Sequence, residues 1–273
     1  MQISVCLLCY GDHPKLARQA LGSIVRVVSA LSPASGPALK DIRIGGNALA
    51  AATVSALREA AVESPKPIYL VEEETGRNVW KYPLMRRLFW DEALPPLPEW
   101  VMWFDDDSHI TATDGAAWWR RLSCELNSGD LVGVRHRQNL RGRQHLGIAA
   151  QPWCRTPPQR GQRVFFVTGG WWVARTEVLR RWDYPFLDIV HNGGDVMLGA
   201  LCAQQGRRVL DFREGVAVNA GLTSALNAAP RRGGTSPLVW IDYQSGKAPE
   251  RGHHNFRIRI GELACKFKRT GST

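Results

Sequence analysis

Three consecutive aspartates end an apolar run in the middle of the chain. The segment 101–104 is followed directly by Asp105, Asp106 and Asp107. Adjacent carboxylates repel one another, so the cluster is costly unless water or a cation compensates for its charge. On a strand, Asp105 and Asp107 would point to one side and offer two oxygen ligands, which suits Mg²⁺ or Mn²⁺ on a diphosphate better than Ca²⁺. Taken alone, the stretch fits an exposed acidic turn better than a metal site, so its place in the fold decides.

A further carboxylate, Asp195, stands at the start of a helical pattern. The residues 191–194 before it are turn formers, and the apolar segment after it ends at Gly206, a residue type that commonly ends helices. The positive end of a helix dipole stabilises the charged form of such a carboxylate. Asp195 therefore fits a helix N-cap, and it also fits a general base that takes a proton from a hydroxyl.

Strand-like and helix-like segments alternate along the first half of the chain, which predicts a parallel sheet with right-handed crossovers. Ligands of such sheets bind beyond the carboxyl ends of the strands, and residues 105–107 end the fourth strand. The second half adds a long irregular excursion at 138–163 and a polar tail beyond residue 212. The predicted strands are 2–9, 41–46, 67–73, 100–107, 130–137, 163–174 and 207–212, and the predicted helices are 14–28, 48–63, 78–94, 114–126, 175–183 and 191–206.

The order of these features resembles glycosyltransferase family 2, whose members have the GT-A fold. The likeness rests on the Tyr-Gly-Asp turn after the first strand, the D-x-D after the fourth, the segment GGWWVARTEVL and the Gly-Gly-Asp that opens the helix DVMLGALCAQQGRRV. It runs from residue 2 to residue 212 and is strongest at 105–107 and 193–208. The resemblance implies an α/β fold with a mixed, mostly parallel central sheet flanked by helices. We expect a single GT-A domain over 1–273, with a nucleotide-sugar-binding half at 1–110, an acceptor half at 111–212 and a basic tail at 213–273.

The resemblance also implies an activity and a set of site residues. The enzyme would move a sugar from a nucleotide-sugar donor to an acceptor hydroxyl with inversion, using Asp195 as general base and Mn²⁺ or Mg²⁺ as a Lewis acid on the diphosphate. Glycines permit close approach and indoles stack on sugars, which favours 169–172 for the acceptor. The expected donor-binding residues are Tyr10, Asp12, Asn47, Asn78, Asp105, Asp106, Arg231 and Arg232; the expected acceptor-binding residues are Gly170, Trp171, Trp172, Asn192 and Gly194; and the expected metal ligands are Asp105, Asp107 and His254.

Three positions depart from the family pattern. Family members carry an Asp-Gly-Ser type turn after the second strand, where this chain has IRIGGNAL, so we expect Asn47 to replace a base-contacting carboxylate. The family's Glu-Asp pair is Gly194-Asp195 here, which leaves one candidate base. The family's last metal ligand is often a histidine in the C-terminal part, a place that His253 or His254 could take.

The formal net charge of +10 is concentrated in two blocks. Residues 131–163 hold seven arginines and no Asp or Glu, and residues 231–273 hold nine Lys or Arg against three acids. A solvated basic face explains such blocks, and so does a phosphate-bearing partner. We expect an anionic acceptor. A hydroxymethylated base in bacteriophage DNA and a cell-envelope saccharide or lipid both fit, and the lack of an apolar anchor favours DNA.

Two other classes of protein fit parts of the sequence. A non-catalytic nucleic-acid-binding domain on a GT-A scaffold would bind without metal and without Asp105, Asp107 or Asp195. A nucleotidyltransferase that makes sugar nucleotides shares the fold, but it carries a Gly-rich basic signature after the first strand. The segment CYGDHPK lacks those glycines, which counts against this class.

Composition places the chain among globular proteins. Hydrophobic residues make up 44% of 273, enough for a full core, and nowhere do about 18 uncharged apolar residues run together as in a membrane span. We expect a soluble cytoplasmic protein, in the host cytoplasm if a phage encodes it. Of six cysteines only Cys6 and Cys9 have C-x-x-C spacing, and on a strand they would face opposite sides. That indicates buried thiols rather than a metal or redox pair.

Overall fold

The computed structural model describes residues 1–31, 36–73, 78–141, 144–187, 189, 193–220 and 256–260. Its first half is an alternation of strands and helices. Four parallel strands, β1 (Gln2–Tyr10), β2 (Ala38–Asn47), β3 (Ile68–Glu73) and β4 (Trp100–Asp105), lie in the order β3-β2-β1-β4. The helices between them are α1 (Pro14–Ser29), α2 (Ala51–Ala61) and α3 (Lys81–Trp90). All of these elements match the predicted ones within a few residues at their ends.

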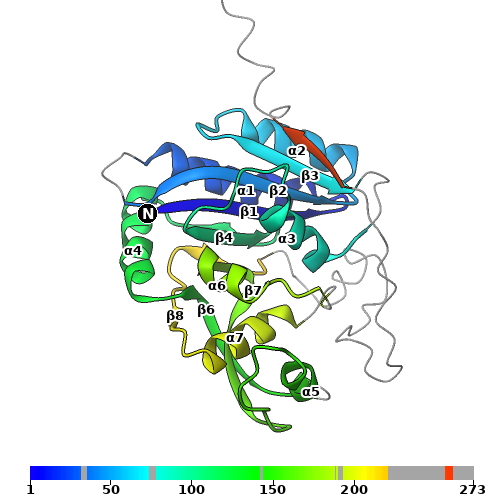
Figure 1. Ribbon diagram of the computed structural model, residues 1–273. Helices are drawn as coiled ribbons and strands as arrows, with labels where there is room; N and C mark the ends of the chain where they lie inside the picture. Colours follow the sequence, from blue (N-terminus) through cyan, green and yellow to red (C-terminus); the bar gives the residue numbers. More distant parts are fainter. Residues whose placement is uncertain are drawn as a thin grey trace, which may run out of the picture.

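The second half extends the same sheet with antiparallel strands (Figure 1). Strand β7 (Arg163–Arg175) pairs antiparallel with β4 and with β6 (Leu131–Asn139), and β8 (Val209–Asp211) pairs parallel with β6. At the other edge, β10 (Phe256–Ile260) pairs antiparallel with β3. The remaining elements are α4 (Gly115–Ser128), α5 (Gln144–Ala149), α6 (Thr176–Arg181), α7 (Gly194–Gln204) and a small sheet of β5 (His109–Ile110) with β9 (Val216–Ala217).

The predicted fold class is confirmed. Within the eight-stranded sheet of the described residues, four of the seven strand pairings are parallel, and helices cover both faces. Helices α1, α2 and α4 pack on one face, while α3 and α7 pack on the other. The sequence did not predict α5, which lies inside the excursion, or the short strands β5, β9 and β10.

Indole side chains fill the core on both faces of the sheet. Trp103 on β4 stacks on Trp172 of the neighbouring strand β7, with ring centroids 6.1 Å apart and planes inclined by 17°. Trp171 points to the opposite face, where it packs against Phe104 and Trp118. Because both faces of this sheet are covered, adjacent tryptophans on opposite faces are both core residues.

One charged pair lies fully inside the core, between β2 and α3. The guanidinium of Arg43 hydrogen bonds to the Asp41 carboxylate at 3.2 and 3.3 Å and to the Leu88 carbonyl at 2.7 Å. It also donates to the Pro95 carbonyl. Arg43 and Asp41 are both buried, so each charge is compensated by the other rather than by water. The pair ties the second strand to the end of α3.

The cysteine prediction is confirmed for the thiols that lie on β1. Cys6 and Cys9 are buried in opposite layers of the core. Burial raises the pKa of Cys6 to about 12, so this thiol stays protonated and unreactive. No helix in the described part of the chain is both long and apolar enough to cross a bilayer.

Candidate functional site

Three polar side chains meet at the carboxyl ends of β1, β2 and β3. Asn78 Oδ1 accepts hydrogen bonds from the Asn47 amide at 3.0 Å, from the Trp80 backbone N–H at 2.9 Å and from the Tyr10 hydroxyl at 3.4 Å. Asn47 Oδ1 in turn accepts from the Val79 N–H at 2.9 Å. The structure thus brings together three of the predicted donor-binding residues. We call Tyr10, Asn47 and Asn78 the amide cluster.

A second group surrounds Asp105, at the end of β4. The Lys81 ammonium donates to Asp105 Oδ2 at 2.8 Å and to the Gly169 carbonyl on β7 at 2.7 Å. The other oxygen, Asp105 Oδ1, accepts from Trp103 Nε1 at 2.9 Å. The Lys81 side chain is 9% exposed and that of Asp105 is 24% exposed. The ion pair is therefore largely shielded from solvent. Lys81 fixes the position of Asp105.

The backbone just before Lys81 is strained. Trp80 has φ +67° and ψ 178°, a conformation that is essentially restricted to glycine and costs on the order of 1–3 kcal/mol in other residues. The Asn78 side chain holds the Trp80 N–H in place. Strain of this size persists only where surrounding contacts impose it. The strained residue joins the amide cluster to Lys81, the first residue of α3.

Asp195 opens α7 and faces the same centre. A side chain added at Gly169 would place its first carbon 3.3 Å from Lys81 Nζ and 3.6 Å from Asp195 Oδ2, so both groups approach the backbone of β7 at one point. Asp195 Oδ1 accepts from the Val196 N–H at 2.9 Å, in the first turn of the helix. Gly194 lets α7 start there, because a Cβ at this position would meet the Tyr82 ring at 2.3–2.6 Å. We call Lys81, Asp105 and Asp195 the charged centre.

The charged centre changes the ionisation of its members and their neighbours. Burial raises the pKa of Asp195, while the Val196 N–H and the nearby positive charge of Lys81 act in the opposite direction. Burial also raises the pKa of Tyr82 and of Tyr184 well above the ordinary value, and the negative charge of Asp195 adds to the effect. Both tyrosines therefore stay neutral, and Asp195 is the carboxyl of the charged centre whose pKa burial raises.

The other two aspartates of the triplet, Asp106 and Asp107, form hydrogen bonds with backbone N–H groups of distant segments. Strand β4 ends at Asp105 and the chain turns, with the Ser108 N–H on the Asp105 carbonyl, so the alternation assumed for Asp105 and Asp107 does not continue. Asp106 is buried, and its Oδ2 accepts from the Tyr10 N–H at 3.2 Å, which ties β4 to β1. Asp107 is also buried on this turn, and its carbonyl accepts from the Ala220 N–H.

The described residues do not complete the predicted metal site. Across the described ranges no three His, Cys, Asp or Glu side chains lie close enough together to hold an ion. Both Asp105 oxygens are engaged, one by Lys81 and one by Trp103, so a divalent ion would have to displace the ammonium to use them. The predicted third ligand, His254, lies outside the described residues together with His253. The metal therefore stays a prediction.

Both tryptophans that were predicted at the acceptor site are core residues, which corrects that expectation. Trp171 and Trp172 are 0% and 1% exposed, so neither offers an indole face to a sugar. Gly170 is small for packing reasons, because a Cβ there would meet Val218, Ser108 and Asn219 at 2.7–2.9 Å. What 169–170 contribute to the site is backbone, above all the Gly169 carbonyl that holds Lys81.

The remaining predicted residues are peripheral or not described. Asp12 is exposed on the turn between β1 and α1. Asn192, Arg231 and Arg232 lie outside the described residues. Lys81 is the residue that sequence reasoning missed. Its signal was a lysine near the start of the third helix, after the loop that follows the third strand, on the side where a parallel sheet binds its ligands.

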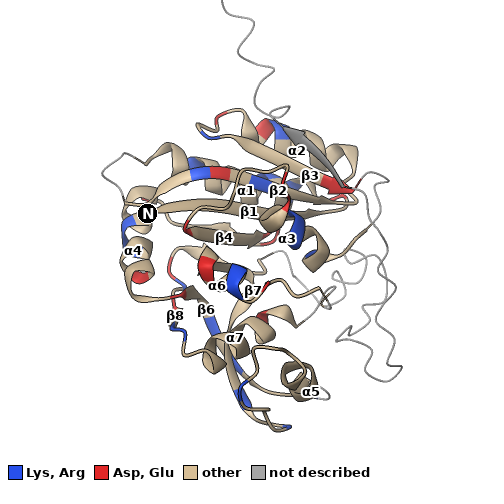
Figure 2. Ribbon diagram, viewed as in Figure 1, with Lys and Arg blue, Asp and Glu red and all other residues tan. Residues whose placement is uncertain are grey.

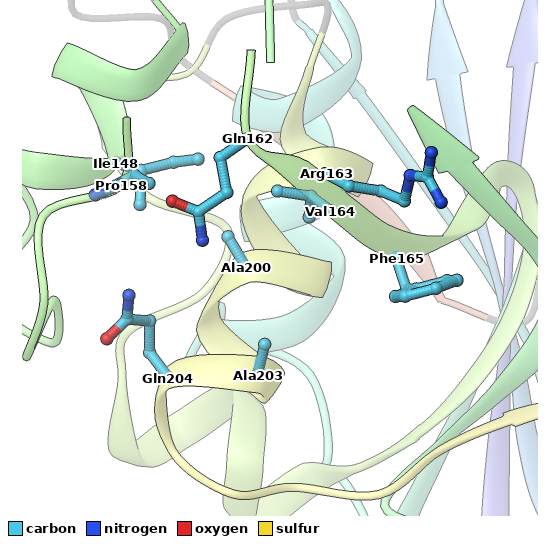
Figure 3. Close-up of a pocket in the computed structure, with 9 residues that line it drawn as sticks. All are labelled: Ile148, Pro158, Gln162, Arg163, Val164, Phe165, Ala200, Ala203 and Gln204. Carbon is cyan, nitrogen blue, oxygen red and sulfur yellow. The ribbon is translucent and has the colours of Figure 1, made fainter. Parts of the chain in front are cut away.

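A pocket lies away from this edge, between α7, β7 and the segment that follows α5 (Figure 3). It encloses about 110 Å³ and is lined by Ile148, Pro158, Gln162, Arg163, Val164, Phe165, Ala200, Ala203 and Gln204. The Gln204 side chain holds the neighbouring backbone in place. Its amide oxygen accepts from the Arg155 and Thr156 N–H groups, and its nitrogen donates to the Thr156 carbonyl. The pocket thus belongs to the packing of the 151–160 segment rather than to the charged centre.

Comparisons with known proteins found solved structures of low similarity to the chain and no matching sequence. No family model and no curated protein sequence matches it. The crystal structure of S. aureus TarS is 14% identical over 81% of this chain, with a TM-score of 0.49, and the chain spans 37% of that protein. The apo form of mouse xyloside xylosyltransferase 1 is 12% identical over 78% of this chain and 85% of its own, with a TM-score of 0.44. The α/β class with a mixed sheet, as predicted from the GT-A resemblance, rests on the strand order itself.

Proposed function

We propose that the chain is a glycosyltransferase that moves a sugar from a nucleotide-sugar donor to an acceptor hydroxyl. One observation carries the proposal: Lys81, Asp105 and Asp195 converge on Gly169 beside the amide cluster, at the carboxyl ends of the parallel strands. Open α/β sheets bind ligands at this edge. The amide cluster supplies hydrogen-bonding groups for a nucleoside, and the charged centre supplies one cation and two carboxylates for the reacting groups.

The reaction would be a single displacement. The Asp195 carboxylate accepts the proton of the acceptor hydroxyl while its oxygen bonds to the anomeric carbon of the donor sugar. The bond between that carbon and the diphosphate oxygen breaks, and the nucleoside diphosphate leaves with the electron pair. One base and one displacement give inversion. The raised pKa of Asp195 suits this task, because a more basic carboxylate accepts a proton more readily.

Lys81 would stabilise the charge on the leaving group. Its ammonium is fixed by Asp105 and the Gly169 carbonyl, so no reorganisation is needed as negative charge develops on the diphosphate. A bound Mn²⁺ or Mg²⁺ would supply Lewis-acid chemistry at the same diphosphate. The proposed ligands of that ion remain Asp105, Asp107 and His254.

The proposed acceptor is anionic, and a hydroxymethylated base in DNA is its leading form, with an envelope saccharide or lipid as the alternative. The test is transfer of labelled sugar from UDP-, GDP-, TDP- and CMP-sugars to hydroxymethylated DNA and to saccharide and lipid acceptors, with and without Mn²⁺. We expect product with one donor and one acceptor class, and loss of product in Asp195→Asn. DNA binding that survives removal of Asp105, Asp107 and Asp195, with no donor bound, would identify a non-catalytic domain instead.

A further inference from the structure

The antiparallel hairpin formed by β6 and β7 carries an exposed face of arginines around one phenylalanine. Phe165 is 43% exposed, and the Arg135 guanidinium lies 4.4 Å from the centre of its ring. Arg137 is directly opposite Phe165 in the strand register, and Arg163 is two residues away on the same strand, so both lie on the same face. Figure 3 shows Arg163 and Phe165 on the side of β7 away from Gln162. We call these four residues the hairpin face.

The hairpin face carries a net positive charge. No Asp or Glu occurs between residues 131 and 163, and Figure 2 shows blue segments without red along this hairpin. Asp211 on β8 offsets part of this charge, because its carboxylate interacts with the Arg135 charge, pairs with Arg213 and accepts from the Arg135 backbone N–H at 2.9 Å. Arg135, Arg137 and Arg163 are exposed, and none forms a described ion pair with an acid. The face therefore complements a polyanion.

The aromatic ring narrows the class of polyanion. Phe165 places an exposed aromatic ring among these arginines, with the Arg135 guanidinium over it. A phosphodiester chain that carries flat bases would use both features, with phosphates on the arginines and a base on the open side of the ring. A polymer without aromatic groups would leave Phe165 unused. Stacking also requires unpaired bases, which favours a single strand over a duplex.

We propose that the hairpin face binds single-stranded nucleic acid and delivers it to the charged centre. Strand β7 runs without interruption from Phe165 to Gly169, whose carbonyl holds Lys81. The four residues of β-strand between Phe165 and Gly169 span about 13 Å. A nucleic acid bound at Phe165 would need to extend only about this far to reach the charged centre. The inference deepens the proposed function, because it names the acceptor class and the surface that holds it. The binding itself, however, requires no catalysis.

The test measures binding of a fluorescein-labelled oligo(dT) of about 15 nucleotides to the full chain by anisotropy, without donor and over a series of salt concentrations. Phe165→Ala should weaken binding about 5- to 100-fold, the range expected for one lost base stack. Arg137→Ala with Arg163→Ala should lower the slope of log K against log salt by about 1.4, because each phosphate contact on a single strand contributes about 0.7.

Matched controls separate this surface from exposed apolar and basic side chains elsewhere on the molecule. Leu187→Ala removes another exposed apolar side chain, and Arg58→Ala with Arg120→Ala removes two exposed arginines on α2 and α4. Both control proteins should bind as the wild type does. The same oligonucleotide in duplex form, a polyphosphate without bases and phosphatidylglycerol vesicles should each bind more weakly and should be insensitive to Phe165→Ala.

Each outcome has a definite meaning. Binding that is unchanged in the Phe165 and arginine variants, or equal for polyphosphate and oligo(dT), overturns the proposal. Vesicle binding that depends on the same four residues would overturn it in favour of a membrane surface. Oligo(dT) binding is measured without any donor and sugar transfer is measured with one, so a failure of sugar transfer and a failure of this inference are distinguishable.

Discussion

Asp195 combines a helix N-terminus with a buried site, and the two act on its proton in opposite directions. Burial raises the pKa of its carboxyl above the ordinary value of 3.8, and the Val196 N–H and Lys81 lower it in part. The raised pKa costs stability, because the fold then holds a carboxylate that water would solvate better. Between the ordinary value and the raised one, the folded protein binds more protons than the unfolded chain. Stability therefore falls as pH rises through this window.

Replacing Asp195 by Asn tests both the cost and the role of the carboxylate. Asp195→Asn keeps the shape and an oxygen for the Val196 N–H, but it removes the charge. We expect a higher melting temperature than wild type at pH 7, with the difference vanishing below the ordinary pKa of aspartate, as measured by calorimetry across pH. We also expect transfer to fall about 10²- to 10⁴-fold, the usual contribution of a general base. An unchanged rate would remove Asp195 from the mechanism.

The same ionisation predicts the pH dependence of wild-type transfer. Only the ionised form of Asp195 accepts a proton, so the rate should decline as pH falls through the raised pKa. This acid limb should lie above the pH at which an ordinary aspartate titrates, because burial raises the pKa of Asp195. The measurement is kcat/KM for transfer against pH. An acid limb at or below 3.8 would show that another group is the base.

Lys81 is expected to act on the donor rather than on the fold as a whole. Lys81→Met keeps most of the apolar stem and removes the ammonium that bonds Asp105 and the Gly169 carbonyl. Loss of a charge-assisted hydrogen bond of about 1.5–3 kcal/mol should weaken donor binding about ten- to a hundredfold. The matched control is Lys66→Met, on the loop between α2 and β3, which should bind donor as wild type does. Equal donor affinities in the two variants would contradict the role of Lys81.

At the scale of elements, the start of α7 is set by the contact between Gly194 and Tyr82. A methyl group at Gly194 would overlap the Tyr82 ring, so Gly194→Ala should push α7 and Asp195 away from the charged centre. Overpacking of this kind costs typically about 1–3 kcal/mol, to be measured by denaturant unfolding. Gly22→Ala in α1 is the control, because nothing lies within 4 Å of a Cβ there and a helix-interior alanine should stabilise by about 0.5–1 kcal/mol. Equal effects of both changes would contradict the packing argument.

The buried pair of Arg43 and Asp41 holds β2 against α3, the helix that begins with Lys81. Arg43→Ala leaves the buried Asp41 carboxyl without its partner, which should cost about 3–5 kcal/mol of unfolding free energy. Arg43→Ala with Asp41→Ala removes both charges and should cost less than the single change. Chemical denaturation of both variants measures the difference. A double variant that is as unstable as the single one would mean that lost packing, rather than an unpaired charge, dominates.

At the scale of the whole molecule, the fold could be predicted because each element carried a local signal. The alternation of apolar strands and amphipathic helices from β1 to β4 placed the carboxyl ends at one edge, and the amide cluster and Asp105 lie there. Strand β10 was missed although FRIRI alternates apolar and charged residues, because it stands alone in a polar tail. The two-residue strands β5 and β9 are too short to have a periodicity.

The site was predicted only in part, because the roles of side chains depend on contacts between distant segments. Alternation correctly put Trp171 and Trp172 on opposite faces, but it could not tell that helices cover both. The same rule failed at Asp107, where the chain has already turned. The pairing of Lys81 with Asp105 and with Gly169 spans 24 and 88 residues, and no local pattern reports it.

Donor binding at the charged centre is the central claim, and a thermal-shift screen tests it most directly. Wild type, Lys81→Met and Lys66→Met are heated with UDP-, GDP-, TDP- and CMP-sugars, with and without Mn²⁺. A donor at a hundred times its Kd stabilises by about 2.7 kcal/mol, which for a chain of this size is a rise of about 5–10 °C. We predict such a rise with one nucleotide in wild type and Lys66→Met, and a much smaller one in Lys81→Met. No rise with any nucleotide-sugar, or an equal rise in all three proteins, would contradict the account.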